Sequence, residues 1–230
     1  MRLLISAFCA LAFCLVTTEV RADSISILNA SFETTSPLGT SCAGAGCAFN
    51  FGPVPDWTIT GATGSFQPGT STNYFNTALP DGSIVAYTNG GTLSQTLAGI
   101  SLLPNATYTL SVDVGRRNDV VAANYSLNLL DGSTVFCTSG PTSNASIAAG
   151  TFTDVTLTCT TGASVPAGLL GIELTGDGRQ IDFDNVQLSV TGGTVATPEP
   201  GALLLTLAGL LMSGLLFLRS RRNLNLQVAA

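Results

Sequence analysis

The chain has 230 residues, of which 45% are hydrophobic and only 10% are charged, and this composition excludes an intrinsically disordered protein. Eight Lys plus Arg stand against 14 Asp plus Glu, and the net charge of −6 predicts no basic surface and no nucleic-acid partner. The chain contains no histidine, and all its basic residues are arginines. This excludes Ser-His, Cys-His and Ser-Lys catalysis as well as His-metal sites.

Residues 1–22 have the pattern of a secretory signal peptide. Arg2 gives a positive start, an apolar run of about 14 residues follows, and the small residue Ala22 stands at the predicted cleavage site. A first transmembrane helix is the alternative, but it needs about 20 apolar residues. We therefore expect the mature chain to begin at Asp23.

Residues 201–218 carry no charge and, at about 1.5 Å per residue, reach about 27 Å, which is close to the thickness of a hydrocarbon core of about 30 Å. The tail that follows, residues 219–230, contains three arginines. The positive-inside rule places this tail in the cytoplasm. These features predict a transmembrane helix and an exported region between the two apolar segments.

The exported region is expected to form one domain, residues 23–190, followed by a linker, residues 191–200. Residues 23–196 hold three arginines and twelve acidic residues, a net charge of −9. A length of about 170 residues fits a single core.

The exported region keeps an even number of cysteines, as expected in an oxidising compartment. Three pairings are open, of which Cys42 with Cys47 and Cys137 with Cys159 are favoured. A metal site of four thiolates is the alternative, although neither pair has the two-residue spacing of a zinc knuckle.

Short runs of alternating apolar and polar residues, bounded by Gly, Pro, Asn or Asp, predict strands and no long helix. Asp131-Gly132 is typical of a hairpin turn. The pattern predicts an all-β, antiparallel β-sandwich of the jelly-roll kind. The nine predicted strands are residues 56–60, 83–88, 92–97, 107–114, 125–130, 134–138, 152–160, 169–175 and 181–190.

Five short motifs follow one another along this region: Asn29-Ala-Ser-Phe-Glu33, Pro53-Val-Pro-Asp-Trp57, Leu79-Pro-Asp-Gly82, Leu93-Ser-Gln-Thr96 with Tyr108-Thr-Leu-Ser-Val-Asp113, and Ile181-Asp-Phe-Asp-Asn-Val-Gln-Leu188. Their order resembles the galactose-binding-like jelly rolls of carbohydrate-binding modules. The resemblance implies a glycan ligand and a structural calcium ion.

The tail carries Pro198-Glu199-Pro200, then the apolar span, then the arginine cluster. This arrangement resembles the PEP-CTERM sorting signal. The resemblance implies exosortase as a partner and transfer to the cell surface or to an exopolysaccharide matrix. A simple membrane anchor stays open as the alternative.

The implied calcium site has Glu33 and Asp184 at the matching positions. Asp182 is expected on the same strand face as Asp184, because side chains repeat every two residues. Carboxylate oxygens suit Ca²⁺. The alternative is that all three are exposed acids at strand ends.

A glycan site needs aromatic rings to stack on a sugar and polar groups to bind its hydroxyls. Trp57 is expected in the core instead. The predicted recognition surface, which an ordinary solvated loop would equally explain, consists of Tyr74, Phe75, Arg116, Arg117, Asn118 and Asp119.

Two further functions stay open. A glycosidase needs two facing acids about 5 to 10 Å apart, and an ice-binding surface would use the threonine ladder Thr156, Thr158 and Thr160. The candidate acids are Glu33, Asp113, Glu173, Asp177, Asp182 and Asp184. The favoured prediction is a non-enzymatic, glycan-binding or matrix protein with no catalytic residue.

Overall fold

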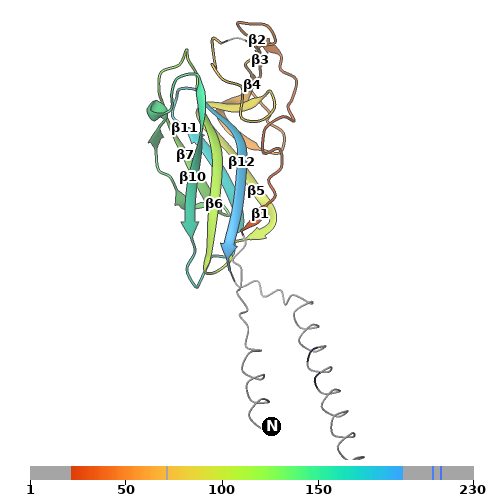
Figure 1. Ribbon diagram of the computed structural model, residues 1–230, viewed down its shortest axis with the longest axis vertical. Helices are drawn as coiled ribbons and strands as arrows, with labels where there is room; N and C mark the ends of the chain where they lie inside the picture. Colours follow the sequence, from red (N-terminus) through yellow and green to blue (C-terminus); the bar gives the residue numbers. More distant parts are fainter. Residues whose placement is uncertain (1–21, 71, 194–208, 210–212, 214–230) are drawn as a thin grey trace, which may run out of the picture. The chain divides into compact units, whose positions relative to one another are not determined.

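The computed structural model describes residues 22–70, 72–193, 209 and 213. The chain divides into two units, Met1–Thr194 and Val195–Ala230. All described strands lie in the first unit (Figure 1). In the second unit only Gly209 and Ser213 are described, and the Ser213 hydroxyl donates a hydrogen bond of 2.9 Å to the Gly209 carbonyl.

The first unit is an all-β sandwich with one short 3₁₀ helix, Asn144–Ser146. All the pairings between its strands are antiparallel. The strands are β1 (Asp23–Ile25), β2 (Thr40–Ser41), β3 (Ala48–Phe49), β4 (Thr58–Gln67), β5 (Val85–Ser101), β6 (Ala106–Arg116), β7 (Asn124–Asp131), β8 (Thr134–Thr138), β9 (Thr142–Ser143), β10 (Thr151–Thr160), β11 (Leu169–Gly176) and β12 (Ile181–Gly192).

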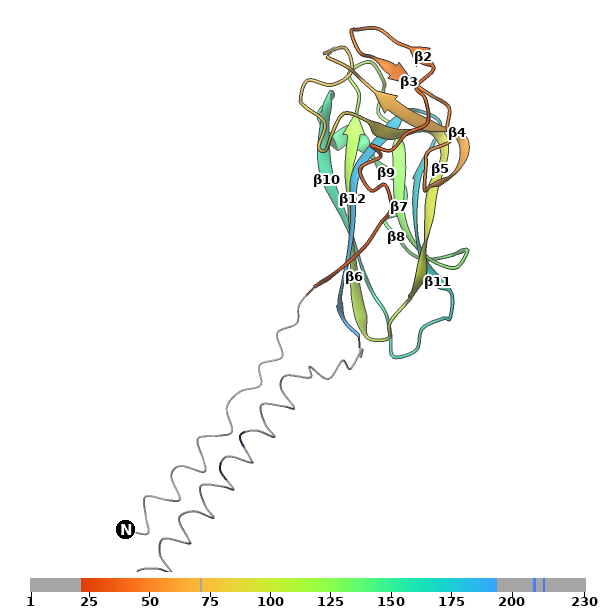
Figure 2. The same ribbon diagram turned by 90° about the vertical axis from the view of Figure 1, so that its right-hand side faces the viewer.

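Strand β5 takes part in both layers of the sandwich. Its residues 86–88 pair with β12, and its residues 91–101 pair with β11. One layer therefore contains β10, β6 and β12, and the other contains β11, β7 and β8 (Figure 2). Between the two pairings lies Gly90, whose φ of 101° is open to glycine and strained for other residues.

The main core lies between the two layers. On β6 the inner side chains Leu110, Val112 and Val114 are fully buried, whereas the alternate residues Ser111 and Asp113 are only half-buried. These inner side chains belong to the same apolar cluster as those of β7 and β11. The alternation that predicted the strands thus also marks the face that is turned to the core.

A second apolar cluster covers the outer face of the first layer near one end of the sandwich. It joins Phe66, Tyr74 and Phe75 from the segment 40–83 to Val85 and Tyr87 of β5. The short strands β2 and β3 lie at this end, at the top of Figure 1. Part of the sheet is consequently buried on both faces, and polar residues that point away from the main core are still removed from water.

The predicted strands agree with eight of the observed ones. The runs 83–88 and 92–97 are one continuous strand, β5, because the strand continues through Gly90 and Gly91, and its residues 85–94 pair with β4. The two-residue strands β2, β3 and β9 were not predicted. They have too few residues to show a period.

Trp57 lies in the main core, as expected. Its ring packs against Phe32 with the centroids 5.3 Å apart, and its Nε1–H donates to the Asn29 carbonyl at 3.2 Å. The disulfides join Cys42 to Cys47 and Cys137 to Cys159, which are the pairs that the sequence favoured.

The predicted signal peptide and transmembrane helix receive no support from the structure. Residues 1–21 lie outside the described residues, and so do all residues of the span 201–218 except Gly209 and Ser213. Pro198, Glu199 and Pro200 lie outside them as well. Within the described part of the chain, no helix has the length and apolar character that a membrane crossing requires.

We expect the Cys137–Cys159 disulfide to stabilise the fold more than the Cys42–Cys47 disulfide. The first closes a loop over a separation of 22 residues and the second over a separation of 5. The chain-entropy relation gives roughly 3 and 2 kcal/mol, respectively. Urea unfolding of the C137A/C159A and C42A/C47A double variants measures both losses. Equal losses, or a larger loss for C42A/C47A, would contradict this ranking.

Candidate active site

A cavity of about 330 Å³ opens beneath the segment 40–83 and beside the second apolar cluster. Aromatic side chains dominate its wall, and a few polar groups gather at one end. Its lining residues are Cys42, Phe49, Phe51, Phe66, Tyr74, Tyr87, Asn89, Arg117 and Gln180.

Strand register brings the aromatic residues together. Phe49 of β3 lies opposite Phe66 of β4, and Phe66 lies opposite Val85 of β5, so these side chains share one face. Phe66 meets Tyr74 edge-on at 5.2 Å, and Phe49 meets Phe51 in the same way at 5.3 Å. The Phe51 side chain is 68% exposed, which places an apolar ring at the solvent side of the cavity.

Arg117 is the charged residue of the lining. Its guanidinium carbon lies 4.5 Å from the Tyr74 ring centroid and 4.9 Å from that of Phe66, at cation–π distance. Its Nε and Nη2 donate to the two carboxylate oxygens of Asp119 at 2.9 and 2.6 Å. The remaining terminal nitrogen, Nη1, donates to Gln180 Oε1 at 2.6 Å.

Asp182 lies directly behind the cavity wall. It is 0% exposed and stands opposite Tyr87 in the pairing of β12 with β5. Its Oδ1 accepts a hydrogen bond of 2.8 Å from Gln180 Nε2, whereas its Oδ2 has no hydrogen-bond partner among the described residues. Both Tyr87 and Gln180 line the cavity. The side chains of Tyr87 and Gln180 thus stand between the aromatic cavity and a buried carboxyl group with one free oxygen.

Burial raises the pKa of Asp182 from 3.8 to about 7. The hydrogen bond from Gln180 and the charge of Arg117 lower this pKa, and the charge of Asp119 raises it, but desolvation is the largest cause. The group therefore keeps its proton up to about neutral pH, and a carboxyl group in that state can act as a general acid.

Tyr87 serves as a fixed hydrogen-bond donor beside the acid. Burial, together with the charge of Asp182, raises the pKa of its phenol to about 12. Its hydroxyl donates to the Asn50 carbonyl at 2.8 Å. This bond holds the ring between β5 and the segment that covers it.

Glu33 and Asp184 bind the turn between β4 and β5 and do not form a group with Asp182. Glu33 Oε1 accepts the backbone N–H groups of Ser83 and Ile84, each at 2.8 Å. Asp184 Oδ2 accepts the Asp81 N–H at 3.0 Å. Among the residues that the structure describes, no cluster of three or more acidic or cysteine side chains could hold a metal ion. Of the three carboxylates expected for calcium, Glu33 and Asp184 accept backbone N–H groups, and Asp182 accepts a side-chain amide.

The residues predicted to recognise a glycan do not form an exposed surface. Tyr74 and Phe75 are buried in the second apolar cluster. The Arg116 guanidinium turns toward the Ala145 and Ile147 carbonyls, away from the cavity. Of the six residues, Tyr74 and Arg117 line the cavity, and Asp119 binds Arg117. Asn118 exchanges amide hydrogen bonds with Asn76.

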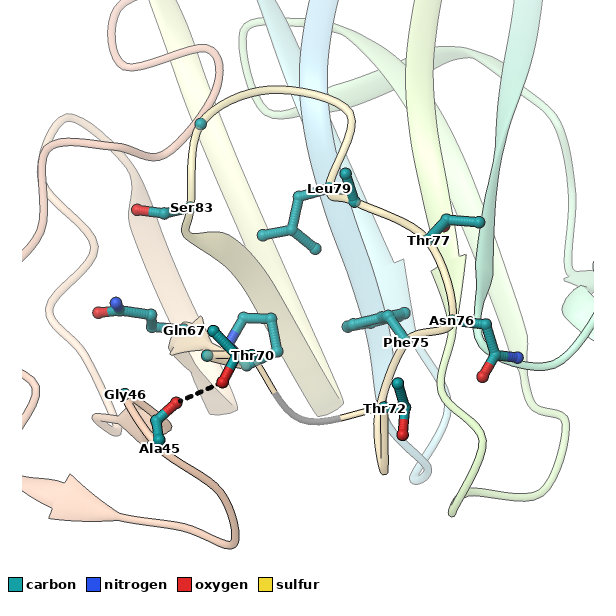
Figure 3. Close-up of a pocket in the computed structure, with 14 residues that line it drawn as sticks. Ala45, Gly46, Gln67, Thr70, Thr72, Phe75, Asn76, Thr77, Leu79 and Ser83 are labelled. Atoms are coloured by element: carbon teal, nitrogen blue, oxygen red, sulfur yellow. Dashed lines mark hydrogen bonds between the residues drawn. The ribbon is translucent and has the colours of Figure 1, made fainter.

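Phe75 borders a second and larger cavity, of about 520 Å³ (Figure 3). Figure 3 shows Phe75 and Leu79 across from Gln67 and Thr70. The Thr70 hydroxyl donates a hydrogen bond to the Ala45 carbonyl. No described residue of its lining is acidic or basic. This cavity can hold a neutral molecule, but it lacks a group for acid or base chemistry.

Sequence reasoning selected Asp182 as a calcium ligand and missed its partners Tyr87 and Gln180. One signal was available: Gln180, Asp182 and Asp184 alternate with Ile181 and Phe183, which marks two distinct faces of one strand. Alternation alone predicts that the polar face is exposed. It carries no information about the segment 40–83 that covers this face.

Comparison with known proteins identifies the family. A family model described as HpiC1-like, HpiC1 cyclase, matches residues 23–189. The chain belongs to the HpiC1-like cyclase family. A search of curated proteins found no match.

Solved structures of cyclases from Fischerella sp. TAU are similar to this HpiC1-like protein. The Stig cyclase Fisc, in complex with (3Z)-3-(1-methyl-2-pyrrolidinylidene)-3H-indole, is 28% identical with a TM-score of 0.61, covering 74% of this chain and 98% of that chain. A cyclase in complex with 4-(1H-indol-3-yl)butan-2-one is 27% identical with a TM-score of 0.60, covering 76% and 100%.

These matches correct the functional interpretation of the sequence. The family found is a cyclase family and neither a PEP-CTERM sorting family nor a carbohydrate-binding module. The predictions of a non-enzymatic matrix protein with exosortase, glycan and membrane partners are wrong, as are the glycosidase and ice-binding alternatives. The counts of His and Lys excluded several mechanisms, but they left acid catalysis by a buried carboxyl group open.

We expect the Asp182→Asn variant to gain stability over the wild type as pH rises. Because the pKa of Asp182 is about 7 when folded and near 3.8 when unfolded, the folded state binds more protons between these values. The stability that the wild type gains from this proton binding is fully present below about pH 4. It is lost as pH rises toward 7, at about 1.4 kcal/mol per pH unit.

Urea unfolding at pH 5, 6, 7 and 8 measures this difference. Asp154→Asn, which alters an exposed aspartate of the same layer, is the matched control. Its free energy of unfolding should change with pH in the same way as that of the wild type. If the free energies of unfolding of Asp182→Asn and the wild type changed with pH in parallel, Asp182 would be ionised in the folded protein.

Proposed function

We propose that this HpiC1-like protein cyclises a small aromatic molecule and that Asp182 is the general acid. The observation that carries the proposal is a buried carboxyl group of raised pKa directly behind the wall of an aromatic cavity. The two indole compounds in the similar Fischerella cyclases support an indole-bearing substrate.

The proposed reaction needs one proton donor that recovers its proton. The neutral Asp182 carboxyl protonates a double bond of the bound molecule and leaves a cation on it. A tethered π bond attacks this cation, and one new carbon–carbon bond closes the ring. The Asp182 carboxylate then accepts the proton that the ring-closed cation loses, so the product is an isomer of the substrate.

The cavity wall suits the cationic stage of this reaction. Aromatic ring faces attract positive charge, and the faces of Phe66 and Tyr74 already hold the Arg117 guanidinium at 4.9 and 4.5 Å. The half-buried Phe49 and exposed Phe51 give apolar contact for the rest of the substrate. We infer that the substrate enters between the Tyr87 ring and the Gln180 amide, where it meets the free Oδ2 of Asp182.

We also infer that the sandwich is a jelly roll and that the protein is exported. Antiparallel pairing between strands far apart in sequence, such as β10 with β6 and β5 with β11, supports the jelly roll. The two disulfides support an oxidising compartment.

We expect Asp182→Asn to abolish turnover and to preserve binding. The amide keeps the size of the carboxyl but donates no proton, and general acid catalysis is typically worth 10²- to 10⁴-fold in rate. Turnover is measured by chromatography and mass spectrometry. The assay follows the conversion of indoles that carry a tethered alkene into products of the same mass.

Binding of 4-(1H-indol-3-yl)butan-2-one, measured by calorimetry, shows whether the cavity is intact. Asp154→Asn should retain both turnover and binding. Turnover by Asp182→Asn within threefold of the wild type would reject Asp182 as the acid.

We propose calcium as a stabilising ion at Asp184. Burial raises the pKa of Asp184 to about 7, and the charges of Asp81 and Asp113 contribute to this increase. A divalent cation would offset this repulsion and add stability by mass action. The melting temperature in millimolar CaCl₂ should then exceed the melting temperature in chelator, and Asp184→Asn should reduce the difference. Equal midpoints for the wild type would exclude the ion.

A further inference from the structure

We propose that Gln180 is a positioning residue that keeps Asp182 Oδ1 as the accepting oxygen, so that the acidic proton resides on the free Oδ2. The inference rests on the proposed function, because it assigns the oxygen from which Asp182 delivers its proton. It begins from the hydrogen bond of 2.8 Å between Gln180 Nε2 and Asp182 Oδ1.

The direction of this hydrogen bond follows from Arg117. A guanidinium group has only donors, so the Gln180 atom that lies 2.6 Å from Arg117 Nη1 must be the amide oxygen. The amide nitrogen is then turned toward Asp182, where it can only donate. Gln180 is 8% exposed, so water has little access to the amide.

Arg117 is itself held in place from two sides. Asp119 binds its Nε and Nη2, and the rings of Tyr74 and Phe66 lie against the guanidinium face. These contacts leave Nη1 directed at Gln180. A chain of hydrogen bonds therefore runs from the rim residue Asp119 through Arg117 and Gln180 to the buried carboxyl group.

The consequence concerns the two oxygens of the neutral acid. The oxygen that accepts the Gln180 N–H uses a lone pair and acts as the carbonyl oxygen. The other oxygen, Oδ2, carries the proton, and within the part of the chain that the structure describes it has no partner to hold that proton back. The donor oxygen is thus selected before a substrate binds, which is a form of preorganisation.

The charged and titratable groups around Asp182 are few. Tyr87 faces it from β5, and Arg117 and Asp119, which follow β6, act on it through space. Among the described residues, Gln180 is the one that donates a hydrogen bond directly to the carboxyl group. Replacement of Gln180 therefore changes the hydrogen bonding of Asp182 and leaves the charges near it in place.

Infrared spectroscopy of the full chain tests the assignment. The C=O stretch of protonated Asp182 at pH 5 is identified by its loss in Asp182→Asn. In Gln180→Met, which keeps the side-chain length and removes the donor, we expect this band to move to higher wavenumber.

Gln187→Met makes the same change at an exposed position of β12 and should leave the band unchanged. Gln180→Leu replaces Gln180→Met if the latter does not fold, as judged by thermal melting. An unshifted band in the Gln180 variant overturns the positioning role, even where Asp182→Asn abolishes turnover. A shifted band with full turnover by Asp182→Asn upholds the positioning and rejects the proposed function instead.

Discussion

The candidate site depends on the burial of one strand face beneath the segment 40–83. Strand β12 already turns Ile181 and Phe183 into the main core, and in an ordinary sandwich its other face would meet water. Here Phe66, Tyr74 and Phe75 cover that face together with Tyr87. Without this cover Asp182 would be a solvated surface acid with an ordinary pKa, and the aromatic cavity would not exist.

Burial of a carboxyl group lowers stability near neutral pH and gives the group its chemistry. Removal of Asp182 from water disfavours the charged form, and Gln180 and Arg117 compensate this effect only in part. The protein therefore retains a neutral acid at the expense of folding free energy. Such a compromise between stability and activity is common at functional sites.

The structure also explains why the sequence-based functional prediction failed. Composition excluded the nucleophilic mechanisms that need His or Lys, but a general acid needs only one carboxyl group in a desolvated place. The motifs that resemble carbohydrate-binding modules mark shared strands of a sandwich. A fold of this kind carries many functions, and the function resides in the cavity that is built onto it.

Local pattern was sufficient to locate eight of the described strands, because the predicted runs combine apolar and polar residues in alternation and are bounded by Gly, Pro, Asn or Asp. It was also sufficient for the core position of Trp57 and for the favoured cysteine pairs. The tertiary structure alone decided that Asp182 is buried and that Tyr87, Gln180 and Arg117 surround it. These residues come from β5, from β12 and the residue before it, and from the segment after β6, so their meeting depends on long-range strand pairing. Alternation tells which face of a strand a residue occupies, and only the folded chain determines what lies over that face.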